Sequence, residues 1–252
     1  MIEVLQSFNL TKELWSFSAV CGILVGMAKT GITGLGMLVV PILAGIFGGK
    51  PSVGLLLPML CFGDIFAVKY YSRHAEWLYL MRLMPWTLTG IIIALFVGNI
   101  VSDTQFKGLI AVTILFGIAL MTWGERRQNE IVIPNHWWFS PLFGLAGGFA
   151  TMIGNAAGPI MALYLLSMHL PKNAYIGTGA WFYMIVNLIK VPLHVFIWKT
   201  ITIQTISFNI AMLPAITAGA VIGVNVIKKI PEKPYRKLII IMTAIASIKL
   251  FI

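Results

Sequence analysis

Apolar residues form ten consecutive segments along the chain, separated by short polar stretches. These segments cover about residues 13–28, 35–49, 51–71, 82–101, 105–123, 137–153, 156–170, 174–196, 204–226 and 236–252. Several reach the roughly 20 residues that a helix needs to span a bilayer, whereas the first, second, sixth and seventh are shorter. The pattern predicts an all-α polytopic membrane protein.

The four short segments form two pairs, and each pair is joined by a polar, glycine-containing break. The breaks are predicted at residues 29–34, within an interruption from Met27 to Leu35, and at residues 151–154. Each pair could be a re-entrant hairpin or two short, tilted spans. Broken helices are tolerated at membrane depth only where they are buried in protein or line a cavity, so both breaks are candidate functional sites.

The arrangement of short pair followed by three longer segments occurs twice, which indicates an internal repeat. At an offset of 122 residues, Gly22 corresponds to Gly144 and Gly26 to Gly148. Each half crosses the membrane an odd number of times, so the second half is predicted to be inverted, as in many secondary transporters. The predicted units are a first repeat at 1–124, a cytoplasmic linker at 125–136 and a second, inverted repeat at 137–252.

Composition supports the membrane assignment. Hydrophobic residues make up 59% of the chain and charged residues 10%, against roughly 25% charged in soluble domains. The formal net charge of +10 comes mostly from short loops, so it indicates membrane orientation and not nucleic-acid binding. The bias of basic residues predicts both termini outside the cytoplasmic membrane. Histidine and cysteine spacing indicates no metal, and we expect no cofactor.

Ionisable groups at membrane depth are costly, so those within the spans are candidate functional residues. Lys29, beside Thr30 and Thr33, could neutralise an anion, with Thr151 and Asn155 donating hydrogen bonds from the second break. Helix N-termini flanking the breaks would add free N–H groups. Lys29 could instead reach an interface, and the threonines could bond to their own helices. The candidate substrate-binding residues are Lys29, Thr30, Thr33, Gly34, Gly36, Thr151, Gly154, Asn155 and Trp181.

Further polar residues lie inside the longer spans. Asp64 is a candidate for coupling or gating by H⁺ or Na⁺, or else a structural hydrogen-bond partner, and Asn187 occupies nearly the same place in the second half. Lys190 and His194 approach the end of their span, where an interfacial location is expected. Trp181 could wall a substrate pocket or pack in the core.

The segments GITGLGMLVVPILAGIFGGKPSVG, GFATMIGNAAGPIMALYLLSMHLPKNAYIGTG and IPEKPYRKLIIIMTAIASIKL resemble the two halves of the sulfite exporter TauE/SafE family. The glycine-rich run before a valine-proline is matched by Gly31, Gly34, Gly36, Val40 and Pro41. The sequence departs from the family's dense glycine run at Leu35 and Met37, and it has Asn155-Ala156-Ala157-Gly158 in the second half.

This resemblance implies a non-enzymatic secondary transporter that moves a small sulfur-containing anion, such as sulfite, a sulfonate (for example sulfoacetate) or thiosulfate, across the cytoplasmic membrane. Alternating access with ion coupling is the expected mechanism, and a homodimer is a possible assembly. An anion channel, or a carrier of a non-sulfur organic anion, is the alternative. No Walker motif occurs, and a threonine beside Lys29 gives only weak support for a membrane-embedded enzyme.

Overall fold

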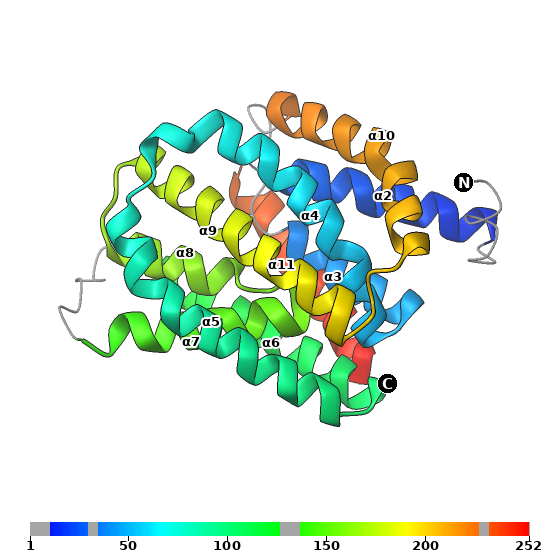
Figure 1. The fold of residues 1–252 in the computed structure, drawn as a ribbon. Helices are drawn as coiled ribbons and strands as arrows, with labels where there is room; N and C mark the ends of the chain where they lie inside the picture. The colour runs from blue at the N-terminus through cyan, green and yellow to red at the C-terminus, as the bar shows by residue number, and fades with distance from the viewer. Residues whose placement is uncertain (1–10, 30–34, 127–136, 227–231, 252) are drawn as a thin grey trace.

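A computed structural model gives the fold and describes residues 11–29, 35–126, 137–226 and 232–251 (Figure 1). Every regular element in these ranges is helical, which confirms the predicted class. The α-helices are α2 (Lys12–Lys29), α3 (Leu35–Phe47), α4 (Gly49–Tyr71), α5 (Trp77–Ile100), α6 (Asp103–Arg126), α7 (Phe139–Gly154), α8 (Gly158–Ser167), α9 (Lys172–Pro192), α10 (Ile203–Val226) and α11 (Glu232–Ile248). Short 3₁₀ turns η1 (Ser72–His74) and η3 (Lys249–Phe251), and a π-helical turn η2 (Leu193–Ile197), complete the set.

The lengths of the helices follow the predicted pattern. Within the described residues, α4, α5, α6, α9 with its π-helical continuation, and α10 are long and apolar enough to cross a membrane. Helices α2, α3, α7 and α8 are short, as predicted. For the last helix, α11 with η3, the apolar part within the described residues is Ile239–Phe251.

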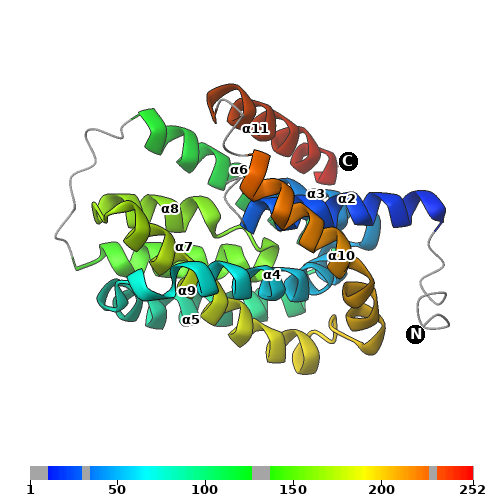
Figure 2. The same cartoon turned by 90° about the horizontal axis from the view of Figure 1, so that it is seen from above.

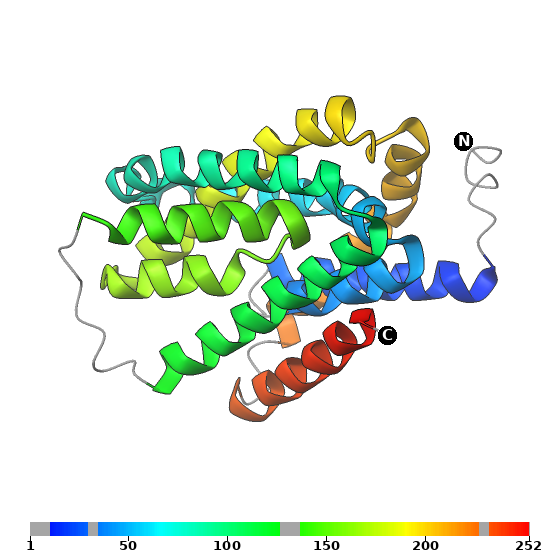
Figure 3. The same ribbon diagram turned by 90° about the horizontal axis from the view of Figure 1, so that it is seen from below.

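Helices α4 and α9 contact each other in the middle of the molecule (Figure 1). On one side α2 packs along α10, and on the other side α5 packs along α7 (Figures 1 and 2). Figure 3 shows α6 beside α11 on the face seen from below. Each short helix that begins a predicted repeat therefore packs on a helix of the other repeat, so the two halves are interleaved.

Glycines allow the two flanking helix pairs to approach backbone to backbone. A Cβ atom added to Gly26 of α2 would overlap the backbone of α10 between Ile216 and Ala220. A Cβ atom added to Gly148 of α7 would overlap the backbone of Thr87 in α5. Small residues at such crossings are the usual means of close helix packing in membranes. Packing therefore explains these two glycines.

At these two helix crossings, α2 with α10 and α5 with α7, the contact residues of α2 and α7 are related by the same 122-residue offset as the predicted repeat. In α10 a Cβ atom added to Gly219 would overlap the backbone of Ile23, and in α5 one added to Gly90 would overlap that of Leu145. Ile23 and Leu145 are 122 residues apart, as are the glycines of the predicted repeat. These equivalent contacts support an internal repeat, and the inversion of the second half stays a prediction.

Apolar and polar side chains are distributed as in a protein that is surrounded by lipid. Large apolar side chains face outward, with Ile100, Ile203 and Phe196 among the most exposed. Polar side chains lie inside, where Asp64 is 1% exposed and Lys190 is fully buried. Charged groups are almost never fully buried unless they are paired, so these two residues mark the centre as a candidate site.

Candidate functional site

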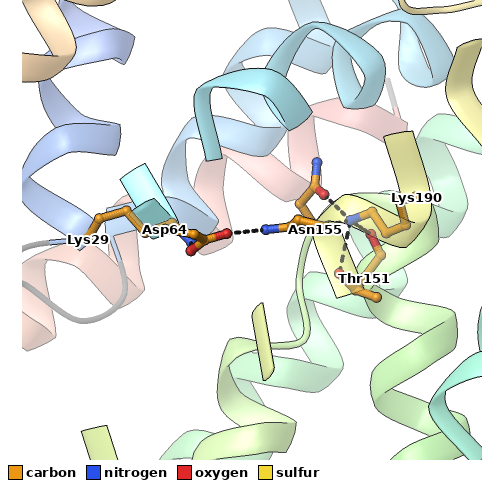
Figure 4. A network of polar contacts seen from close by, with 6 residues as sticks. Lys29, Asp64, Thr151, Asn155 and Lys190 are labelled. Atoms are coloured by element: carbon orange, nitrogen blue, oxygen red, sulfur yellow. Dashed lines mark hydrogen bonds and ion pairs between the residues drawn. The ribbon is translucent and has the colours of Figure 1, made fainter. Parts of the chain in front are cut away.

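A chain of polar side chains runs between α4 and α9 and joins the ends of α2 and α7 (Figure 4). Helix α2 ends at Lys29, and α7 ends at Gly154. The two predicted breaks are thus connected through side chains of the two central helices. We define the polar network as Lys29, Asp64, Thr151, Asn155, Asn187 and Lys190.

Lys29 and Asp64 form the first contact of the network. The Lys29 ammonium donates to Asp64 Oδ1 and pairs with its charge, and the carboxylate is buried while the lysine side chain is 16% exposed. The stem of Lys29 packs against α4 at Gly63, where a Cβ atom would lie 2.7 Å from Lys29 Cγ. The ammonium also lies 5.2 Å from the centroid of the Tyr183 ring, a cation–π geometry. Lys29 is held inside the protein and does not extend to an interface.

Asn187 links the carboxylate to the second lysine. Its Nδ2 donates to Asp64 Oδ2 over 2.7 Å, and its Oδ1 accepts from Lys190 Nζ over 3.2 Å. Because a carboxylate only accepts and an ammonium only donates, these partners fix the orientation of the amide. Asp64 and Asn187 occupy nearly equivalent places in the two predicted repeats and face each other across the α4–α9 contact.

Lys190 is fully buried, and its ammonium is surrounded by neutral oxygens. It donates to the Thr151 carbonyl over 2.9 Å, to Thr151 Oγ1 over 3.0 Å and to Asn155 Oδ1 over 2.5 Å, besides Asn187. The carbonyl belongs to the last turn of α7, where the negative end of the helix dipole favours a cation. Among the described residues, Lys190 has no carboxylate in ion-pair contact.

The second break begins four residues later than predicted and ends three residues later. Residues 151–154 form the last turn of α7, and the break consists of Asn155, Ala156 and Ala157. Asn155 adopts a left-handed conformation with φ of 50°, and its N–H bonds back to Thr151 O. Asparagine tolerates this conformation better than most residues, so Asn155 ends α7 directly after Gly154.

The remaining predicted site residues do not join the polar network. A Cβ atom at Gly36 of α3 would lie 3.9 Å from Ala28 Cβ of α2, and one at Gly154 would lie 3.5 Å from Thr113 Oγ1 of α6, both ordinary contacts, so their binding roles stay predictions. Trp181 lies on the opposite side of α9 from Lys190, and its ring packs on Trp77 of α5 with centroids 5.2 Å apart. The predicted candidates that lie outside the described residues are Thr30, Thr33 and Gly34.

Lys190 and His194, predicted at an interface, are both buried within the protein, and His194 lies three residues from the end of the span at Ile197. Both side chains are fully buried, and His194 Nδ1 bonds to Thr200 Oγ1 over 2.8 Å inside the π-helical turn η2. That turn continues the span to Ile197, which leaves Lys190 well within it. A signal was present in the sequence: Tyr183, Asn187, Lys190 and His194 recur at spacings of four, three and four, which places them on one face of a helix.

The polar network is closed by contacts between its own members, since the described polar side chains bond to one another. A hollow of about 190 Å³ lies between α4 and α10, but its lining is apolar apart from Asn209 and includes none of the network residues. Among the described residues no three His, Cys, Asp or Glu side chains gather as a metal site would require. Two lysines and one aspartate give the network a formal charge of +1, which an anion would balance.

An outward apolar surface, five candidate spans and a buried charged network between helix breaks together define a multi-pass membrane protein with a polar centre. The chain belongs to the sulfite exporter TauE/SafE family, whose model matches residues 18–250. Membership implies a membrane transporter of sulfur anions such as sulfite. No curated protein and no solved structure matches the chain.

Proposed function

We propose that the protein is a secondary transporter that carries a small sulfur oxyanion or sulfonate across the cytoplasmic membrane by alternating access. Sulfite, thiosulfate and sulfoacetate are the candidate substrates. The observation that supports the proposal is the polar network itself, in which Lys29 pairs with Asp64 at the end of α2, Asn187 bridges Asp64 to Lys190, and Lys190 contacts the end of α7. Sulfite bound as the monoanion hydrogensulfite would bring the formal charge of the network to zero, whereas the dianions thiosulfate and sulfoacetate would make it −1.

The donors of the network suit an oxyanion. A sulfonate has three acceptor oxygens and one delocalised charge, so it needs a cation and several donors. Lys29 and Lys190 supply the ammonium groups, and the amide of Asn187 supplies a neutral donor that now serves Asp64. Thr151 and Asn155 hold Lys190 in place and would turn their own donors to the substrate when the network opens.

Alternating access fits the interleaved helices. Each break belongs to a short helix that packs on the opposite predicted half, so a movement of one half against the other would separate the two breaks. The closed network is then an occluded state, and opening on either side would expose the same lysines in turn. Ion coupling through Asp64, by H⁺ or Na⁺, is part of the proposal, and so is an orientation with both termini outside.

A binding screen tests the proposal. Detergent-purified protein is titrated with sulfite, thiosulfate, sulfoacetate, taurine, sulfate and matched carboxylates while its thermal unfolding is followed. An anion far above its Kd stabilises the folded protein by a few kcal/mol, about 2.7 kcal/mol at 100 times Kd. We expect a sulfur anion to stabilise the wild type but neither Lys29→Ala nor Asn155→Ala.

Lys107→Ala is the matched control, because Lys107 pairs with Asp103 near the surface and lies outside the polar network. Its response to anions should equal that of the wild type. Stabilisation that survives in both network variants would place the anion site elsewhere, and stabilisation by none of the sulfur anions would contradict the proposed substrate class.

A further inference from the structure

The carboxylate of Asp64 lies where the proposed substrate would bind. Lys29 donates to its Oδ1 and Asn187 donates to its Oδ2, so each carboxylate oxygen has a donor (Figure 4). A carboxylate and a sulfonate present the same chemistry to such donors, namely acceptor oxygens that share one negative charge. In the closed network, Asp64 therefore makes the contacts that an oxyanion would make.

The position of Lys29 inside the protein makes its ion pair with Asp64 energetically important. Its ammonium lies inside the protein with Tyr183 as the other described contact, and its stem is fixed on the backbone of α4 at Gly63. Lys190 has four neutral oxygens around its ammonium, whereas the described acceptor of Lys29 is Asp64, so without an anion the Lys29 charge would be strongly unfavourable at membrane depth. A carrier has to pass through this occluded conformation without substrate on its return, and Asp64 supplies the missing negative charge at that step.

Resting on the proposed function, we propose that Asp64 is a tethered competitor of the substrate, which occupies the anion site when the carrier is empty and is displaced from Lys29 and Asn187 when an oxyanion binds. The affinity for the substrate then reflects the difference between two binding free energies at the same donors, that of the substrate and that of the Asp64 carboxylate. Return of the empty carrier depends on the Asp64 carboxylate, which is the tethered anion.

Two consequences distinguish a competitor from a residue that merely supports the fold. Replacement of Asp64 by asparagine keeps the shape and removes the charge, so external anions should bind more tightly. The same replacement leaves Lys29 unpaired in the empty carrier, so net transport should fall while exchange of substrate for substrate should persist. A structural role predicts weaker binding and a parallel loss of both activities.

Titration calorimetry with sulfite and with sulfoacetate measures the first consequence. Asp64→Asn should bind about 10- to 100-fold more tightly than the wild type, the range expected for removal of a competing hydrogen bond between charged groups. Asp64→Glu restores a tethered anion and should return the affinity toward the wild-type value. Asp103→Asn removes a carboxylate that caps α4 at Gly49, outside the polar network, and should leave the affinity unchanged.

The double variant Lys29→Gln, Asp64→Asn tests whether the gain in anion affinity requires Lys29. It should lose the tighter binding, because Lys29 is the donor that the competitor releases. If the gain persists without Lys29, or if Asp64→Asn binds sulfur anions no better than the wild type does, Asp64 is not a competitor at this site.

Proteoliposomes measure the second consequence, with labelled sulfite or sulfoacetate and Asp64→Asn. We expect exchange to continue and net efflux to fall by about tenfold or more, which corresponds to a barrier raised by about 1.4 kcal/mol. Equal loss of exchange and efflux would overturn the inference. If the wild type binds no sulfur anion, the proposed function fails; a gain in Asp64→Asn alone would still support a tethered competitor, and no gain would reject both.

Discussion

Helix α7 carries two adjacent glycines with opposite surroundings, and they allow a matched test of the close crossing between α5 and α7. A Cβ atom at Gly148 would overlap the backbone of Thr87. A Cβ atom at Gly147 would lie 3.7 Å from Ile160 Cγ2, which is an ordinary van der Waals contact. The two alanine variants therefore share one helix and one chemical change and differ in packing alone.

The expected free energies of unfolding differ in sign. Alanine gains about 1 kcal/mol over glycine in a helix interior, and this gain applies at both positions. Overpacking costs about 1–3 kcal/mol, and at Gly148 the obstacle is backbone that cannot rotate away, so we take the upper end. The net expectation is a loss of about 2 kcal/mol for Gly148→Ala and a gain of up to about 1 kcal/mol for Gly147→Ala.

Thermal unfolding in detergent, followed by tryptophan fluorescence, measures the difference. At about 2–4 °C per kcal/mol for a chain of this size, Tm should fall by about 4–8 °C in Gly148→Ala and rise by about 2–4 °C in Gly147→Ala. Gly148→Ala should also weaken anion binding, because Thr151 lies one turn further along α7 and holds Lys190. Equal shifts of Tm in the two variants would refute the close backbone contact between α5 and α7 at Gly148.

Three further predictions concern the polar network and its surroundings. Asn155→Ala and Asn155→Gly both remove the contact with Lys190 and should both weaken anion binding, but Tm should fall further for alanine, because φ of 50° costs it about 1–2 kcal/mol; equal Tm values would argue against the left-handed turn. Tyr183→Leu removes the ring beside the Lys29 ammonium and should raise the Kd about tenfold or more in calorimetry, whereas Tyr183→Phe keeps the ring and most of the affinity. Trp181→Phe should change the Kd for the anion by less than about twofold, because the Trp181 ring packs on Trp77. A larger change would indicate that Trp181 contributes to the anion site.

Much of the site could be predicted from the sequence, because charges inside apolar spans are rare enough to stand out. Lys29, Asp64 and Asn187 were chosen one by one for this reason, and the structure brings them into direct contact. Thr151 and Asn155 followed from their place at a helix break. The binding roles of these residues remain predictions, since the structure shows where they lie and not what they bind.

The errors have identifiable physical causes. Lys190 is predicted at an interface because it lies near the end of the apolar run at 174–196, but its ammonium bonds to Thr151 and Asn155 at the end of α7 and is buried there. The second break was placed too early because glycine suggested the interruption, whereas Gly154 stays helical and Asn155 adopts the left-handed turn. Both outcomes depend on tertiary packing, which a reading of segment lengths does not contain.

The predicted division into two repeats and a linker stays a prediction. Segment order indicated two halves, and the matched glycine crossings follow the same offset. The interleaving of the halves could not be predicted, since segment order gives no information on which helices pack together. Most of the predicted linker at 125–136 lies outside the described residues, so its boundaries stay predictions.

Counterflow in proteoliposomes tests the central claim most directly, that an oxyanion carrier works through the polar network. Vesicles are loaded with unlabelled sulfite or sulfoacetate, and uptake of a labelled trace from outside is followed over time. We predict a transient accumulation of label above equilibrium in the wild type and in Lys107→Ala, and none in Lys190→Gln. A channel would equilibrate the label without overshoot, so the absence of overshoot in the wild type, or its persistence in Lys190→Gln, would contradict the account.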